Sequence, residues 1–136
     1  MKSDQAQVYR APASLELNHW GLTGTWIDHG EAAELKTANG SIIFRFHARD
    51  LHLVLGPSTG GPGTVGPGAG PVRFRVRIDG QAPGADHGVD CDEQGLGTVT
   101  ENRLYQLIRQ HGTIKDHTFE IEFLDAGVQA FAFTFG

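Results

Sequence analysis

Apolar side chains alternate with arginines between Val72 and Ile78, and this two-residue period constrains the fold more than any other feature of the chain. Successive side chains of a β-strand point to opposite faces, so the pattern predicts a strand with one buried and one solvent-facing side. The same alternation recurs in four other segments, which are Ser41–His47, Leu51–Leu55, Phe119–Phe123 and Ala130–Phe135. In the last of these we expect Phe131, Phe133 and Phe135 on one face and the smaller residues on the other.

Weaker alternation predicts three shorter strands nearer the N-terminus, at Ser14–Asn18, Gly24–Asp28 and Glu31–Lys36. Asn39-Gly40 lies between two strand candidates and is typical of a tight hairpin turn. The apolar residues of Glu101–Gln110 fit both a helical face and a strand, and we favour the strand. The chain has 19 glycines and 6 prolines with 39% hydrophobic residues, a composition typical of many turns between short segments.

Together these patterns predict an all-β fold, an antiparallel jelly-roll-like β-sandwich of eight or nine strands. The 136 residues correspond to a single domain covering residues 1–136, which is long enough to bury one core. Residues 56–71 hold seven glycines and four prolines and have almost nothing to bury. We expect a flexible loop there. A lid over a binding face is the alternative, because long loops in compact domains are often functional.

The net charge of −5 argues against nucleic acid and acidic membrane surfaces as partners, since proteins bind both through basic patches. No apolar run approaches the roughly 20 residues that cross a bilayer, and we expect no transmembrane segment. The first ten residues lack the apolar core of a signal peptide. An export signal, if the natural protein has one, would therefore lie upstream of this chain.

Glu120 and Glu122 are the main candidates for catalysis. They share one face of a predicted strand about 7 Å apart, a separation that inverting glycosidases use. The arginines of Val72–Ile78 form a similar polar row, however, and pairing of opposite charges across strands is the ordinary role of such rows. No Gly-x-Ser-x-Gly motif is present. We therefore expect no catalytic residues and no enzymatic activity.

Two groups of residues raise the question of metal binding. His47 and His52 flank a short turn and could face each other, but two ligands do not make a zinc site. The segment 90–101 nearly follows a calcium-loop pattern, with Asp90, Asp92 and Glu101 at its first, third and last positions. The alternatives are a solvated histidine pair and an acidic turn. Calcium is the only cofactor that the sequence suggests.

Cys91 is the only cysteine, so the chain can form neither an internal disulfide nor a Cys-x-x-Cys redox motif. Its neighbours Asp90 and Asp92 carry negative charge, which raises the pKa of a thiol. We expect no reactive thiolate at this position.

Aromatic residues point to ligand binding by stacking. Trp20 lies close to Asn18 at a predicted strand end, where an indole ring could cover the flat C–H face of a sugar. Trp26 lies in the middle of a strand and fits the core. The residues that we expect to contact a ligand are Trp20, Asn18, His47, Arg75 and Tyr105.

Several stretches resemble the C-terminal domain of DipZ-type bacterial proteins, and they occur in the same order along the chain. They are Ser41–Gly56, Val76–Gly80, Gly88–Asp92, Arg103–Arg109 and Phe131–Gly136. The resemblance extends from about Tyr9 to Gly136. DipZ-type proteins are membrane proteins linked to cytochrome c biogenesis and thiol–disulfide exchange. They join a membrane domain, a thioredoxin-like domain that carries Cys-x-x-Cys, and a terminal β-sandwich similar to carbohydrate-binding modules.

The resemblance implies a non-catalytic, carbohydrate-binding-module-like accessory domain on the extracytoplasmic side. Its partner would be a thioredoxin-like domain in the same or another chain, and no redox residue carries over. Fold alone does not establish a ligand, so two alternatives stay open. An exposed apolar patch would favour a domain that docks a thioredoxin-like partner without binding sugar. Glutamates clear of arginine partners would favour a small glycoside hydrolase using Glu120 and Glu122.

Overall fold

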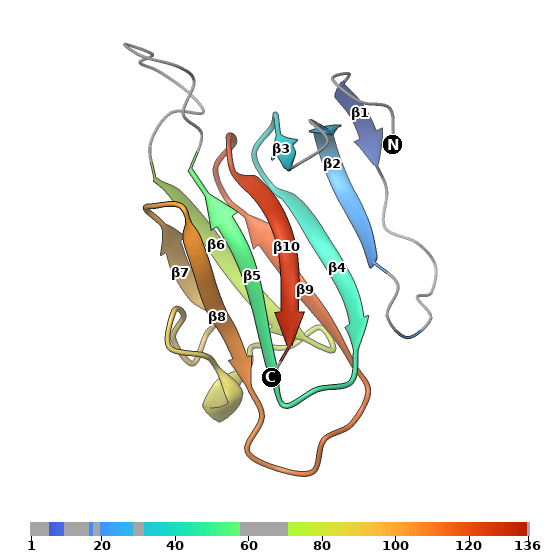
Figure 1. Cartoon of the computed structure of the whole chain (residues 1–136), viewed down its shortest axis with the longest axis vertical. Coiled ribbons are helices and arrows are strands. Elements are labelled where there is room, and N and C mark those ends of the chain that lie inside the picture. Colours follow the sequence, from blue (N-terminus) through green and yellow to red (C-terminus); the bar gives the residue numbers. More distant parts are fainter. Residues whose placement is uncertain (1–5, 10–16, 18–19, 29–31, 58–70, 136) are drawn as a thin grey trace.

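The computed structural model describes residues 6–9, 17, 20–28, 32–57 and 71–135 (Figure 1). Within these residues the regular structure consists of ten strands and one 3₁₀ turn, η1 (Gly84–Asp86). The strands are β1 (Ala6–Tyr9), β2 (Trp20–Asp28), β3 (Ala33–Leu35), β4 (Gly40–Phe46), β5 (Asp50–Gly56), β6 (Val72–Ile78), β7 (Leu96–Val99), β8 (Arg103–Arg109), β9 (His117–Phe123) and β10 (Gln129–Phe135). No helix in this part of the chain has the length and apolarity needed to cross a membrane.

The strands form two antiparallel layers that share β2. Sheet A has the order β8-β5-β10-β3-β2-β1, and sheet B has the order β7-β6-β9-β4-β2. Figure 1 shows β5, β8 and β10 in front of β6 and β9. Buried apolar side chains from both layers form the hydrophobic core. The predicted antiparallel, jelly-roll-like β-sandwich is confirmed.

Strand β2 passes from one sheet to the other at Gly24. Residues 20–23 pair with β4 in sheet B, whereas residues 26–28 pair with β3 in sheet A. Gly24 has φ +99°, which favours glycine, and a Cβ atom there would lie 2.8 Å from the Cα of Gly40. The Trp26 Nε1–H donates to the Thr23 carbonyl across this bend at 2.7 Å. The second half of β2 therefore closes one side of the sandwich, and its first half belongs to sheet B.

The predicted alternation is confirmed in β4, β5, β6 and β9, whose apolar side chains fill the space between the sheets. Trp26 and Tyr105 are the largest fully buried side chains. Each ring meets a phenylalanine edge-on, Trp26 with Phe123 at 6.1 Å and Tyr105 with Phe74 at 6.5 Å between ring centroids. These aromatic contacts between the layers fix the position of one sheet relative to the other.

The ambiguous segment Glu101–Gln110 contains strand β8, as favoured. The ambiguity has a physical cause, because the register between β5 and β8 shifts by one residue. Leu51 faces Ile108 and His52 faces Gln106, which leaves Leu107 without a partner of its own. Both Leu107 and Ile108 are buried. Two adjacent inward residues interrupt a strand period and imitate the spacing of a helix.

The phenylalanine pattern of β10 is also interrupted by a bulge. The register with β5 shifts between Ala130 and Ala132, so that Ala130 faces Leu55. Ala130 is buried and Phe131 is partly exposed, which reverses the prediction at the start of this strand. The strand lies inside sheet A, between β3 and β5.

The Asn39-Gly40 hairpin prediction is wrong, because β3 belongs to sheet A and β4 to sheet B. Asn39 has φ +67° and its N–H donates to the Phe123 carbonyl of β9. A Cβ atom on Gly40 would overlap the Leu35 side chain, which lies 2.3 Å away. The dipeptide turns the chain from one layer to the other.

Strands β1 and β7 were not predicted from the sequence. The predicted strand Ser14–Asn18 lies outside the described residues except for Leu17, which is in a turn. The predicted flexible loop at 56–71 lies outside them at residues 58–70.

Candidate functional site

A cleft of about 240 Å³ opens between the two layers beside the first half of β2. Sheet B contributes side chains of β2 and β4, and sheet A contributes side chains of β3, β5 and β10. The lining residues are Trp20, Leu22, Ala33, Ile42, Leu53, Ala130 and Phe131. All of these residues are apolar, so the cleft offers contact area rather than acid–base chemistry.

Trp20 is the exposed aromatic residue of this cleft. It lies opposite Phe44 of β4, so the register places it on the inner side of sheet B. Its side chain is nevertheless 53% exposed, whereas Trp26 on the same strand is fully buried. The difference follows from the bend at Gly24, since only the second half of β2 joins sheet A. The sequence prediction that separated Trp20 from a core Trp26 agrees with this geometry.

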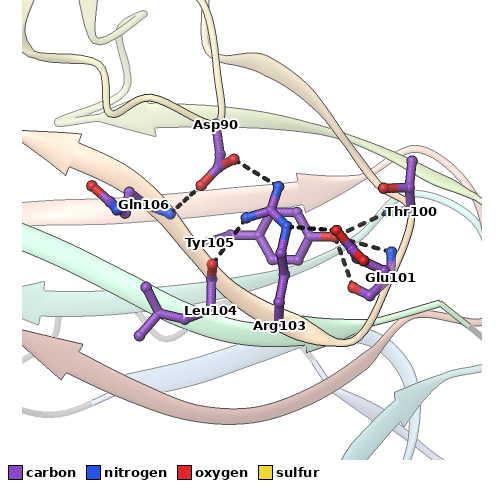
Figure 2. Close-up of polar contacts among 7 residues, drawn as sticks. All are labelled: Asp90, Thr100, Glu101, Arg103, Leu104, Tyr105 and Gln106. Carbon is purple, nitrogen blue, oxygen red and sulfur yellow. Dashed lines mark hydrogen bonds and ion pairs between the residues drawn. The ribbon is translucent and has the colours of Figure 1, made fainter.

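Asn18 and Tyr105 were also predicted to contact a ligand. Asn18 lies outside the described residues. Tyr105 is fully buried, and its hydroxyl accepts hydrogen bonds from the Thr100 and Glu101 N–H groups and donates one to the Glu101 carbonyl (Figure 2). The prediction that Tyr105 contacts a ligand is therefore wrong, because its ring fills the core and its hydroxyl is saturated by its own chain.

Arg103 organises two of the three carboxylates that suggested calcium. Its Nη2 atom lies 2.8 Å from Asp90 Oδ1 and its Nε atom lies 3.4 Å from Glu101 Oε1. Figure 2 shows the guanidinium over the Tyr105 ring, and its Cζ lies 3.9 Å from the ring centroid. Burial raises the pKa of Asp90, but the hydrogen bonds from Arg103 and the Gln106 N–H outweigh this and lower it overall. A fixed cation of the protein thus occupies the place between these acids.

The third carboxylate, Asp92, stabilises a turn. Its Oδ1 atom accepts hydrogen bonds from the Gln94 and Leu96 N–H groups, both at 2.9 Å. Within the part of the chain that the structure describes, no group of three or more His, Cys, Asp or Glu side chains could hold a metal ion. The geometry therefore supports the acidic turn rather than a calcium loop.

The two histidines do not form a pair across a hairpin, because β4 lies in sheet B and β5 in sheet A. His47 is about half exposed, and its Nδ1 atom is hydrogen-bonded to Asp116 Oδ1 at 2.7 Å. His47 directly follows the last residue of β4. It is not among the residues that line the cleft.

The outer face of sheet B carries the arginine and glutamate rows. Strands β6 and β9 pair so that Arg77 faces Glu120 and Arg75 faces Glu122. The Arg77 Nη1 atom lies 3.6 Å from Glu120 and 3.7 Å from Glu122. Both carboxylates therefore share an arginine partner, which is the ordinary cross-strand arrangement and not the arginine-free one that would favour the hydrolase alternative.

Cys91 is buried, and its thiol donates to the Leu107 carbonyl at 3.2 Å. Its pKa is raised to about 11, mainly by burial. The Gly88 N–H lowers the pKa, whereas the negative charges of Asp92 and Asp90 raise it. The thiol is therefore protonated at neutral pH and stays part of the core.

Comparison with solved structures supports the β-sandwich. The chain is 12% identical to a family two carbohydrate esterase from Clostridium thermocellum in complex with cellohexaose, with a TM-score of 0.55 over 78% of this chain and 27% of the esterase. An active-site mutant of a family two carbohydrate esterase from the same organism gives 12% identity and a TM-score of 0.62 over 88% of this chain and 31% of that chain. This chain thus corresponds to less than a third of either esterase, and the likeness concerns the fold.

Sequence comparison identifies the family. The search of curated proteins found no match. A family model described as "Thioredoxin like C-terminal domain" matches residues 1–136, which is the whole chain. Because this model covers the whole chain, the chain belongs to the family of thioredoxin-like C-terminal domains.

Proposed function

We propose that this chain is a non-catalytic, carbohydrate-binding accessory domain of an extracytoplasmic thiol–disulfide protein related to cytochrome c biogenesis. The observation that carries the proposal is the half-exposed indole of Trp20 at the mouth of an apolar cleft. The family supports an association with a thioredoxin-like domain. The sandwich neighbours, one of them in complex with cellohexaose, support the binding of a sugar chain.

The cleft suits a sugar ring for a physical reason. A pyranose presents a flat C–H face that an indole covers, and the remaining apolar side chains extend that contact area. Trp20 lies at the end of a strand that is hydrogen-bonded to β4, so the sheet fixes its backbone before a ligand arrives. None of the residues lining the cleft carries a titratable group, which supports binding without catalysis.

A second candidate function is docking of a thioredoxin-like partner without sugar. The specific observation in its favour is that the cleft lining is apolar throughout, because sugar sites usually add polar groups for the hydroxyls. An apolar side chain of a partner protein would fill the same space. Both functions use Trp20, so the two must be separated by ligand and not by residue.

Trp20→Ala is expected to weaken glycan binding by about tenfold or more, because it removes the stacking surface. A glycan array, read with and without calcium, identifies the glycan, and titration calorimetry then compares the wild type with the variant. Ile114→Ala is the matched control, since Ile114 is also exposed, at 42%, but does not line the cleft. It should bind like the wild type.

Glycan binding that survives Trp20→Ala would contradict the proposed site. An array without binding, together with Trp20-dependent binding to the thioredoxin-like domain of the same protein, would support docking instead. Calcium should change neither result, because Arg103 already pairs with Asp90 and Glu101.

A further inference from the structure

The three arginines of β6 differ in how their charges are satisfied. Arg73 makes two hydrogen bonds to the Asp125 carboxylate, at 3.0 and 2.9 Å, and Arg77 lies between Glu120 and Glu122. Arg75 lies between them on the same face, about 7 Å from each along the strand. Its side chain makes no ion pair or hydrogen bond with any other residue that the structure describes. One guanidinium of the row is therefore available to a ligand.

Arg75 borders two hollows along the β6–β7 side of sheet B. One has a volume of about 390 Å³ and includes Arg73 and Thr98, and the other has about 300 Å³ and includes Arg77 and Gln94. Arg75 and Leu96 line both hollows, and Leu96 is 36% exposed. An unpaired guanidinium thus lies beside an exposed apolar side chain, with a hydroxyl and an amide within the adjoining hollows.

We propose that Arg75 anchors a second binding site, for a sugar residue that carries a carboxylate, such as a hexuronate. A guanidinium binds a carboxylate through two parallel hydrogen bonds. Leu96 would contact the C–H face of the ring, and Thr98 and Gln94 would bind its hydroxyls. A hexuronate combines these three kinds of group in one ring, which a glutamate side chain of a peptide does not.

This site goes beyond the proposed function, because it does not depend on Trp20. Arg75 projects from the outer face of sheet B, whereas Trp20 and Leu22 line the cleft on its inner side. Either site can therefore exist without the other, and their variants report separately.

Removing the negative charge of Glu122 tests whether Arg75 binds an anion. Glu122 faces Arg75 in the strand register, but its carboxylate lies near Arg77. If Arg75 binds an anion, Glu122→Gln removes a repulsive charge and should tighten binding. If no anion binds at Arg75, the same change should leave the binding of an anionic sugar unchanged.

The experiment uses trigalacturonate as the probe, with cellotriose as a neutral sugar and a glutamate hexapeptide as a carboxylate without sugar. Arg75→Gln should weaken trigalacturonate binding by about tenfold or more, since it removes a charge-assisted hydrogen-bond pair. Arg109→Gln is the matched control, because Arg109 is an exposed arginine on strand β8 of sheet A. Arg109→Gln and Trp20→Ala should both bind trigalacturonate with the affinity of the wild type.

Thermal unfolding of each variant establishes that it is folded. A further variant, Arg75→Lys, keeps the positive charge but loses the paired hydrogen bonds of the guanidinium. We expect Arg75→Lys to bind more weakly than the wild type and high salt to weaken binding generally. The absence of trigalacturonate binding would overturn the proposal. An equal loss of trigalacturonate affinity in Arg75→Gln and Arg109→Gln would also overturn it. So would an affinity for the glutamate hexapeptide equal to that for trigalacturonate.

Discussion

Replacing Gly24 by alanine is expected to lower the free energy of unfolding by about 3 kcal/mol. Two effects add at this position. Gly24 has φ +99°, where an L-residue is strained, and the new Cβ would lie 2.8 Å from the Cα of Gly40, a backbone atom that cannot rotate away. Because β2 passes from sheet B to sheet A here, relief of the overlap would separate the two layers. Urea unfolding followed by tryptophan fluorescence measures the loss.

Two other glycines separate the strain from the overlap. Gly80 has φ +81° but nothing within 4 Å of an added Cβ, so Gly80→Ala should cost only about 1 kcal/mol. Gly112 has open space around it and no positive φ, so Gly112→Ala should change stability little. If Gly24→Ala were no more destabilising than Gly80→Ala, the close approach of β2 and β4 would not constrain the fold.

The strands that could be predicted from sequence are those with one face buried along their whole length. Val72–Ile78 alternates without interruption because each apolar residue meets the opposite sheet and each arginine meets solvent or a neighbouring carboxylate. The pattern fails in β8 and β10, where bulges shift the register with β5 by one residue. A bulge depends on the partner strand, which local sequence does not reveal.

The connections were harder to predict than the strands. Asn39-Gly40 has the composition of a hairpin turn, but the strands on either side pair with different sheets. Which strands pair is decided by contacts distant in sequence, such as those of β4 with β9. The bend at Gly24 is a similar case, because a glycine within an apolar segment does not by itself indicate a change of sheet.

The candidate site was predictable in part. The position of Trp20 at a strand end indicated an accessible ring, and the mid-strand position of Trp26 indicated a buried one. The apolar side chains that share the cleft with Trp20 come from five strands of both layers, so no local pattern could unite them. The acidic segment was misleading because its partner, Arg103, lies beyond the end of the calcium-loop pattern.

Tyr105→Phe is expected to destabilise the domain by about 2 kcal/mol although it removes a single oxygen atom. That hydroxyl accepts hydrogen bonds from two backbone N–H groups, of Thr100 and Glu101, and donates to the Glu101 carbonyl at 2.8 Å. The phenylalanine ring would fill the same core space, so the loss comes from backbone groups left without partners. Denaturant unfolding of the variant measures the change in free energy.

Hydrogen exchange shows whether this explanation is right, because the lost bonds belong to named amides. The Thr100 and Glu101 amides connect β7 to β8, and in Tyr105→Phe they should exchange faster than in the wild type under native conditions. The Ile121 amide, in the middle of β9, is a control that should change only with global stability.

Arg103→Met complements the test, since it removes the cation over the ring while the hydroxyl keeps its three bonds. If that variant left the Thr100 and Glu101 amides protected, the hydroxyl alone would hold the turn. If both variants exposed these amides equally, the three hydroxyl bonds would not be sufficient to hold the turn, and the role given to the hydroxyl would be wrong.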